Sequence, residues 1–190
     1  MTISLPIDPD ANELLSRDPL ALLIGMLLDQ QVPLEKAFSG PRDLVRRLGH
    51  EPTAQELADC DPDALAAVFS MRPALHRYPR AMAARTQDLA RLIVDRYDGE
   101  PARLWTTAGT GQELVRRITG LPGFGATKAQ IFAALLAKQL GVRPPGWQEA
   151  TGPFGQEGSR ISVADITDRE SLAEVRAYKL QRKAAAKAAR

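Results

Sequence analysis

The stretch Ile118–Val142, ITGLPGFGATKAQIFAALLAKQLGV, decides the fold expected of this chain. Pro122 fixes its own φ and favours the end of a helix over the preceding residues Glu113–Ile118. Gly123 and Gly125 can adopt backbone conformations that other residues avoid, and neither puts a side chain in the way of an approaching group. We therefore expect a tight hairpin whose tip can be touched closely.

The residues after the hairpin predict a helix with an accessible amino end. Apolar residues recur at helical spacing from Ala126 to Leu140, and Gly141 is typical of helix carboxyl ends. The amides of the first helical turn have no partners inside the helix and carry partial positive charge, so they favour a phosphate. Lys128 adds a full positive charge nearby. The same residues also fit an ordinary turn between two packed helices.

The pattern LPGxG, followed by small and polar residues and an apolar helix, resembles the helix-hairpin-helix motif. Its wider context resembles the HhH-GPD superfamily of base-excision DNA glycosylases. Leu22–Val32, LLIGMLLDQQV, is similar to an early helix of that family, in which an apolar run ends in a Gln-containing segment that enters DNA. Asp61–Trp105 is similar to the central helices. The resemblance covers roughly residues 18–141.

Helix signals dominate the whole chain, and no stretch alternates like a strand. Asp61-Pro62 begins a helix, and Thr53 with Glu56 and Thr167 with Glu170 have the spacing of capping boxes. We expect breaks at Gly40-Pro41, Gly49–Pro52 and Asp98–Pro101, and over the Gly- and Pro-rich segment Pro144–Ser159. The predicted fold class is all-α.

The resemblance implies that residues 1–190 form one unit with two helical lobes and a groove between them. The central lobe would span roughly residues 33–140, and the second lobe would combine residues 1–32 with 141–190. The hairpin would lie at the lip of the groove. The basic end, residues 180–190, is either an electrostatic DNA tether or a loose solubilising terminus.

Composition fits a globular chain and excludes several classes. The hydrophobic fraction is 44% of 190 residues, and no run of about 18 apolar residues predicts a membrane span. Asp8 and Asp10 lie where a secretory signal would be basic and apolar, so a cytoplasmic location is expected. The single cysteine, Cys60, cannot form an internal disulfide or bind an iron–sulfur cluster. His50 and His76 lack partners at metal-binding spacing, and no metal site is assigned.

Charge is unevenly distributed, although the net charge is only +2. Residues 1–70 hold 12 acidic and 5 basic side chains, whereas residues 71–130 hold 10 basic and 5 acidic ones. Residues 169–190 hold 7 basic and 2 acidic side chains. A basic middle and a basic end suit a polyanion such as double-stranded DNA, although they also describe solvated faces.

Several residues are candidates for DNA contact. Gln31 matches the family's wedge or groove position, and Gln30 is next to it; an amide can bond base edges while remaining neutral. Two glutamines facing water are the alternative. Arg77 and Tyr78 belong to a basic turn suited to phosphates, or to a solvated loop. The remaining candidates form the hairpin tip and the helix start: Gly123, Phe124, Gly125, Ala126, Thr127 and Lys128.

The catalytic acid is where the chain departs from the family. Cleavage of an N-glycosidic bond builds positive charge on the sugar, so a carboxylate near C1′ is wanted. The family's Asp follows the second hairpin helix, but here Gly141–Gln148 contains no acid and Pro145 aligns with that Asp. Replacement candidates are Glu149, the nearest in sequence, then Asp165 and Asp29. For each, a surface or capping role is the alternative.

The resemblance bears on four further points. Strand-cleaving relatives carry a Schiff-base lysine where this chain has Thr127. Lys128 is one residue later, which is about 100° round the helix, and its side chain is expected to face the phosphate. No lyase activity is therefore expected. Trp147 is the candidate for stacking in a base pocket, in a fixed and exposed loop. Relatives hold a monovalent cation on the hairpin carbonyls. We expect a monomer that is a monofunctional glycosylase or a non-catalytic DNA-binding protein; a protein-interaction module is a third interpretation.

Overall fold

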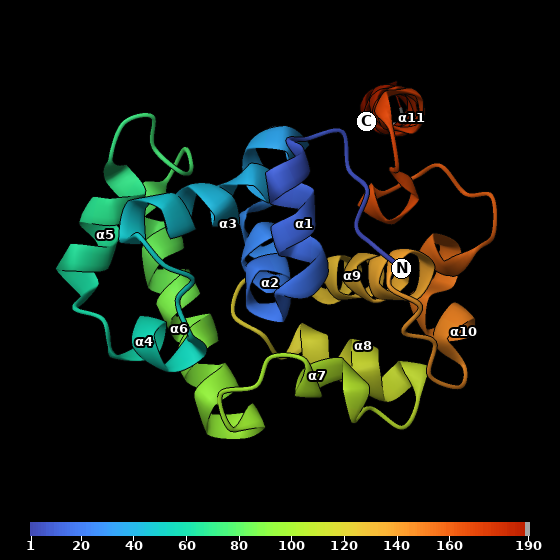
Figure 1. Cartoon of the computed structure of the whole chain (residues 1–190). Helices are drawn as coiled ribbons and strands as arrows, with labels where there is room; N and C mark the ends of the chain where they lie inside the picture. Colours follow the sequence, from blue (N-terminus) through green and yellow to red (C-terminus); the bar gives the residue numbers. More distant parts are fainter. Residues whose placement is uncertain (189–190) are drawn as a thin grey trace.

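The computed structural model describes residues 1–188, and within this range the chain forms helices and no strand (Figure 1). The all-α prediction is confirmed. In chain order the elements are α1 (Pro9–Arg17), α2 (Pro19–Leu28), α3 (Leu34–Leu48), α4 (Ala54–Asp59), α5 (Pro62–Ser70), α6 (Pro79–Tyr97), α7 (Arg103–Thr106), α8 (Gly111–Thr119), α9 (Ala126–Gln139), α10 (Trp147–Thr151), the short 3₁₀ helices η1 (Gly152–Gly155) and η2 (Val163–Asp165), and α11 (Arg169–Ala188).

Two groups of helices lie on either side of α1 and α2 (Figure 1). On one side α4 and α5 pack on α6, and on the other α9 packs against α8, α10, η1 and η2. The buried apolar side chains form one contiguous cluster that runs through both groups. The division into lobes at residues 33 and 140 stays a prediction.

Helix α2 is the centre of the molecule. Every residue from Leu20 to Leu28 is buried, as expected of a helix that is apolar all round. The carboxylate of Asp18 accepts a hydrogen bond from the amide of Leu20 at 2.8 Å, and Pro19 occupies the first turn. Because α2 ends at Leu28, the polar residues that follow emerge directly from the core.

The predicted helix starts can be compared with the structure. Asp61 caps α5, and Pro62 lies in its first turn, as expected. Thr53 and Glu56 form the expected capping box at α4. The box expected at Thr167 is wrong, because Asp168 caps α11 instead by accepting from the amide of Ser171 at 2.8 Å. The carboxylate one residue further along takes the place of the threonine hydroxyl.

The breaks at residues 49–52 and 98–101 are confirmed, but the other two are wrong at least in part. Helix α3 continues through Pro41, which is buried, and Gly40 lets α3 approach α2 so closely that a Cβ there would lie 2.6 Å from Leu28 Cδ1. Packing on α2 therefore outweighs the amide hydrogen bond that the proline lacks. Within residues 144–159, the part 147–155 forms α10 and η1, because α10 packs against α8 and α9.

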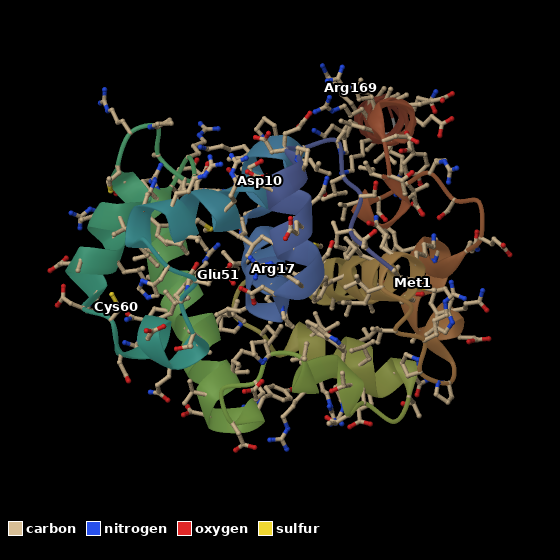
Figure 2. All side chains as sticks on the ribbon, in the orientation of Figure 1. Met1, Asp10, Arg17, Glu51, Cys60 and Arg169 are labelled. Carbon is tan, nitrogen blue, oxygen red and sulfur yellow. The ribbon has the colours of Figure 1, made fainter. Side chains whose placement is uncertain are left out.

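Ion pairs tie the surface elements together. Arg17 of α1 binds Glu51 beyond the end of α3, with Arg17 Nη1 at 2.7 Å from Glu51 Oε2 (Figure 2).

No helix among residues 1–188 combines the length and the apolar character that a bilayer crossing demands.

Candidate nucleic-acid interface

The two glycines of the hairpin between α8 and α9 have different environments. Gly123 has a φ of +81°, and a Cβ on it would lie 2.5 Å from Leu27 Cδ1. Gly125 has an ordinary φ of −82°, and a Cβ on it would meet no atom within 4 Å. Gly123 thus fixes the turn against α2, whereas Gly125 leaves the space in front of α9 open.

The apolar side chains of the hairpin hold it to the core. Leu121 and Phe124 are buried, and the Phe124 ring lies 6.1 Å from the Phe132 ring. The expectation that Phe124 contacts DNA is therefore corrected for its side chain, which packs inward because it is the largest apolar group of the turn. Only its backbone can face a ligand.

The amino end of α9 carries unpaired amides. No side chain caps this end, and Gly125, Ala126 and Thr127 are exposed. The dipole of a helix of 14 residues adds partial positive charge there. This arrangement favours a phosphate at the tip of the hairpin.

Lys128 does not face a phosphate, contrary to the expectation from its position in the sequence. Its Nζ donates to the carbonyl of Met26 at 2.8 Å and to that of Leu27 at 3.4 Å. These carbonyls belong to the last turn of α2 and have no partners within the helix. Burial lowers the pKa of the Lys128 amine. Lys128 therefore fastens α9 to the carboxyl end of α2.

The two glutamines after α2 differ in what they do. Gln30 folds back, because its Nε2 donates to the carbonyl of Leu27 at 2.8 Å while its Oε1 accepts from Arg85 Nη1 at 3.1 Å. Gln31 is exposed, and its side chain forms no hydrogen bond within residues 1–188. Its φ of +57° lies in the left-handed region, where a side chain is strained. Gln31 is thus the glutamine presented to a ligand.

His76 joins the basic turn to this segment. Its buried imidazole donates from Nε2 to the carbonyl of Gln30 at 2.8 Å, and its Nδ1 accepts from the amide of Tyr78 at 3.0 Å. Tyr78 is 45% exposed, and the Arg77 guanidinium lies 5.4 Å from the centre of its ring. The structure therefore brings Arg77 and Tyr78 to the edge where the glutamines lie.

A concavity of about 620 Å³, called here the α2–α9 concavity, lies between the carboxyl end of α2 and the amino end of α9. Side chains from α9, η2 and α11 complete its wall. It is lined by Met26, Asp29, Gln30, Gln31, Val32, Pro33, Thr127, Lys128, Ile131, Ser162, Val163, Lys179 and Lys183.

Asp29 is the carboxylate of the α2–α9 concavity. It terminates α2, is half-buried, and forms no side-chain hydrogen bond within the part of the chain described. Burial raises the pKa of its carboxyl group, whereas the positive charges of Lys128 and Lys179 act in the opposite direction. A half-buried acid without a hydrogen-bond donor is free to act on a ligand.

The other two candidate acids lie elsewhere. Glu149 is exposed on α10 and does not line the α2–α9 concavity. Asp165 has a side chain only 1% exposed; it pairs with Lys138 Nζ at 2.6 Å and accepts from the amides of Ile161 and Ser162. Its bonds are those of a structural acid.

Trp147 is also separated from the glutamines. It begins α10, is half-buried rather than held in an exposed loop, and lines a second cavity of about 340 Å³ with Lys138, Arg143 and Asp165. We call this the α10 cavity. The Arg143 guanidinium lies 5.8 Å from the centre of the Trp147 ring. The structure therefore does not bring Trp147 together with the hairpin tip.

The sequence alone did not single out three basic residues of this region. Arg85 lies beside the hairpin, since a Cβ on Gly123 would be 3.9 Å from Arg85 Cδ. Lys179 and Lys183 reach the α2–α9 concavity from α11. The spacing of four residues between these lysines was a signal that one helix face carries both, whereas nothing local distinguished Arg85.

The fold and this site define an all-helical protein in which a helix-hairpin-helix lies next to a concavity with a carboxylate. The family model of the HhH-GPD superfamily base excision DNA repair protein matches residues 24–190. Because this match includes most of the chain, the protein belongs to that family. Comparisons with curated proteins and with solved structures gave no match.

Proposed function

We propose that this base-excision repair protein is a monofunctional DNA N-glycosylase. It would bind duplex DNA through its hairpin and turn a damaged or mismatched base out of the stack. The observation that carries the proposal is the α2–α9 concavity, which joins the Asp29 carboxylate, the strained Gln31 and the open start of α9.

Asp29 takes the role that the missing acid after α9 leaves open. When the bond between C1′ and the base nitrogen breaks, its electron pair leaves with the base and the sugar becomes positively charged. The Asp29 carboxylate would stabilise that charge and orient a water molecule. The water oxygen then bonds to C1′, and its proton is available to the departing base.

The surrounding residues would hold the DNA. Gln31 is the residue offered as a wedge, because it is exposed and its strained backbone is fixed by the anchored Gln30. Arg77, Tyr78 and Arg85 lie at the same edge and suit the sugar-phosphate backbone. Phosphates next to the extruded nucleotide would then be held on both sides of the wedge.

No lyase reaction is proposed. Thr127 occupies the position of the Schiff-base lysine, and the Lys128 amine is bonded to two carbonyls of α2. A monovalent cation on the hairpin carbonyls would add positive charge beside the phosphate, and it stays a prediction. A monomeric state and a cytoplasmic location likewise stay predictions.

A second candidate function is DNA binding without catalysis. One observation favours it: Pro145, which aligns with the family's Asp, has no carboxylate, and its carbonyl accepts a hydrogen bond from the Gly111 amide at 2.8 Å. The backbone of Pro145 therefore joins the start of α8 to the loop after α9.

The test is a panel of duplexes that contain uracil, an alkylated purine, oxidised guanine or mismatched adenine. We expect an abasic product from one of them, and we expect Asp29→Asn to lose it while Glu149→Gln keeps it. Tight binding without product on every duplex would favour the second candidate. Loss of product in Glu149→Gln alone would move the catalytic acid to α10.

A further inference from the structure

Helix α11 forms part of the wall of the α2–α9 concavity. Lys179 and Lys183 both line the concavity, and they lie one helical turn apart on the same face of α11. The basic end of the chain therefore includes two lysines that face the candidate site.

The start of α11 is fixed to the rest of the protein. Leu172 and Val175 are buried, and Arg176 Nη2 lies 3.0 Å from both carboxylate oxygens of Glu35 on α3. Leu180 is 67% exposed, so the apolar contact ends before it. Lys179 thus follows the anchored part directly and is not on a loose terminus; residues 189–190 of the expected tail lie outside the described residues.

The two lysines are unlike the third lysine of the concavity. The Lys128 amine is bonded to two carbonyls, whereas Lys179 and Lys183 form no hydrogen bond or ion pair within residues 1–188. Asp29 is the only acid among the residues that line the concavity there. Two exposed ammonium groups without partners favour an anion on this wall.

Two separate walls of one concavity therefore favour negative charge. The open amides at the start of α9 form one, and the lysines of α11 form the other. A chain of phosphates can contact both walls at once. The arrangement suits a nucleic-acid backbone.

We propose that α11 is a DNA-binding element, in which Lys179 and Lys183 each contact a backbone phosphate across the concavity from the hairpin. The inference rests on one part of the proposed function, namely that the ligand is duplex DNA. It does not depend on the proposed reaction. The two contacts would also keep DNA close to Asp29.

The experiment measures the affinity of the full chain for a short unmodified duplex over a range of salt concentrations. For the double variant Lys179→Ala/Lys183→Ala we expect an affinity about tenfold lower and a salt slope smaller by about 1.8, which is two phosphate contacts. Arg182→Ala is the matched control: it removes a positive charge from α11, but Arg182 does not line the concavity and lies 6.0 Å from the Tyr178 ring. The salt slope of Arg182→Ala should change by less than half of the change per lysine in the double variant.

The outcomes separate this inference from the proposed reaction. An unchanged slope in the double variant, with normal binding by the unsubstituted protein, overturns the role of α11 and leaves the glycosylase proposal intact. A change in Arg182→Ala as large as the change per lysine also overturns it, because the effect would then be one of net charge. The expected slope change without base release on any duplex supports α11 as a DNA-binding element while the glycosylase proposal fails. If the unsubstituted protein does not bind DNA, both fail.

Discussion

The two ends of α9 each border a cavity, and they differ in whether the polar groups there have hydrogen-bond partners. At the amino end, the Asp29 carboxylate and the first amides of α9 have no hydrogen-bond partner within the described chain. At the carboxyl end, Lys138 Nζ bonds to Gln156, Ser159 and Asp165 at 2.6–2.9 Å.

This difference distinguishes a candidate ligand-binding site from a contact that stabilises the fold. Polar groups that satisfy one another stabilise the fold, and an unpaired group is retained where a ligand uses it. The comparison therefore favours Asp29 over Asp165, although both are acids near α9. It also predicts that substitutions at the two ends have different consequences.

The largest expected effect is on catalysis at the amino end. Asp29→Asn should lower the rate of base release by about 10²–10⁴-fold, because the neutral amide cannot stabilise positive charge at C1′. DNA affinity should remain within about threefold, since the side chains are of equal size. Single-turnover cleavage with an excess of protein measures the rate, and a full rate in this variant would remove Asp29 from the reaction.

At the carboxyl end the same type of substitution should act on stability. Asp165→Asn leaves the partly buried Lys138 without its counter-charge and should lower the free energy of unfolding by about 3 kcal/mol. Urea denaturation measures the change. The rate of base release per folded molecule should be unchanged, and a large loss of rate in folded protein would contradict the distinction between the two ends.

The hairpin glycines give a second contrast, within the amino end itself. Gly123→Ala should destabilise the protein by about 2 kcal/mol, because the methyl group meets Leu27 and φ is positive. Gly125→Ala should leave the melting temperature unchanged and weaken DNA binding about tenfold, because its methyl group occupies the space offered to a phosphate. Unchanged DNA affinity in Gly125→Ala would contradict the position of the DNA.

The hairpin could be predicted from the sequence because its signals are local. Proline and glycine restrict or free φ wherever they occur, and the apolar spacing after Ala126 defines one helix face. By contrast, the continuation of α3 through Pro41 depends on the contact of Gly40 with Leu28 of α2. That contact joins two helices and leaves no local pattern.

The catalytic candidates illustrate the same limit. Distance along the chain favours Glu149, but in the structure it is Asp29 that lines the same concavity as Thr127. The sequence predicts the wrong direction for the Lys128 side chain for a related reason: its partners are carbonyls of α2, about 100 residues earlier in the sequence. Unpaired carbonyls at a helix end are invisible until the neighbouring helix is known.

The pH dependence should report the burial of Asp29. Because burial raises the pKa of this carboxyl group, activity should fall on acidification at a higher pH than an exposed aspartate, about 4, would give. A folded-state pKa above the unfolded value means that stability is lost as pH rises through it. Asp29→Asn should therefore be more stable than the unsubstituted protein at pH 7, and the difference should vanish in acid. Thermal melts of both proteins at pH 7 and in acid measure this difference in stability. No stabilisation of Asp29→Asn at pH 7 would contradict the burial of this carboxylate.

The smallest expected effect concerns strain at Gln31. Gln31→Gly should stabilise the protein by about 1 kcal/mol, since glycine adopts the positive φ without strain. The same variant should release the base more slowly, because it lacks a wedge. Gln30→Ala is the control for packing: it should destabilise the protein, as Gln30 bonds to Leu27 and Arg85.

The most direct test of the account is to map which backbone amides respond when a short duplex binds, by following their NMR resonances. We predict the largest shifts at Gly123–Lys128 and Gln30–Val32, with small ones around the α10 cavity at Arg143–Arg160. Shifts confined to Arg143–Arg160, with the hairpin amides unmoved, would contradict the claim that DNA is held at the amino end of α9.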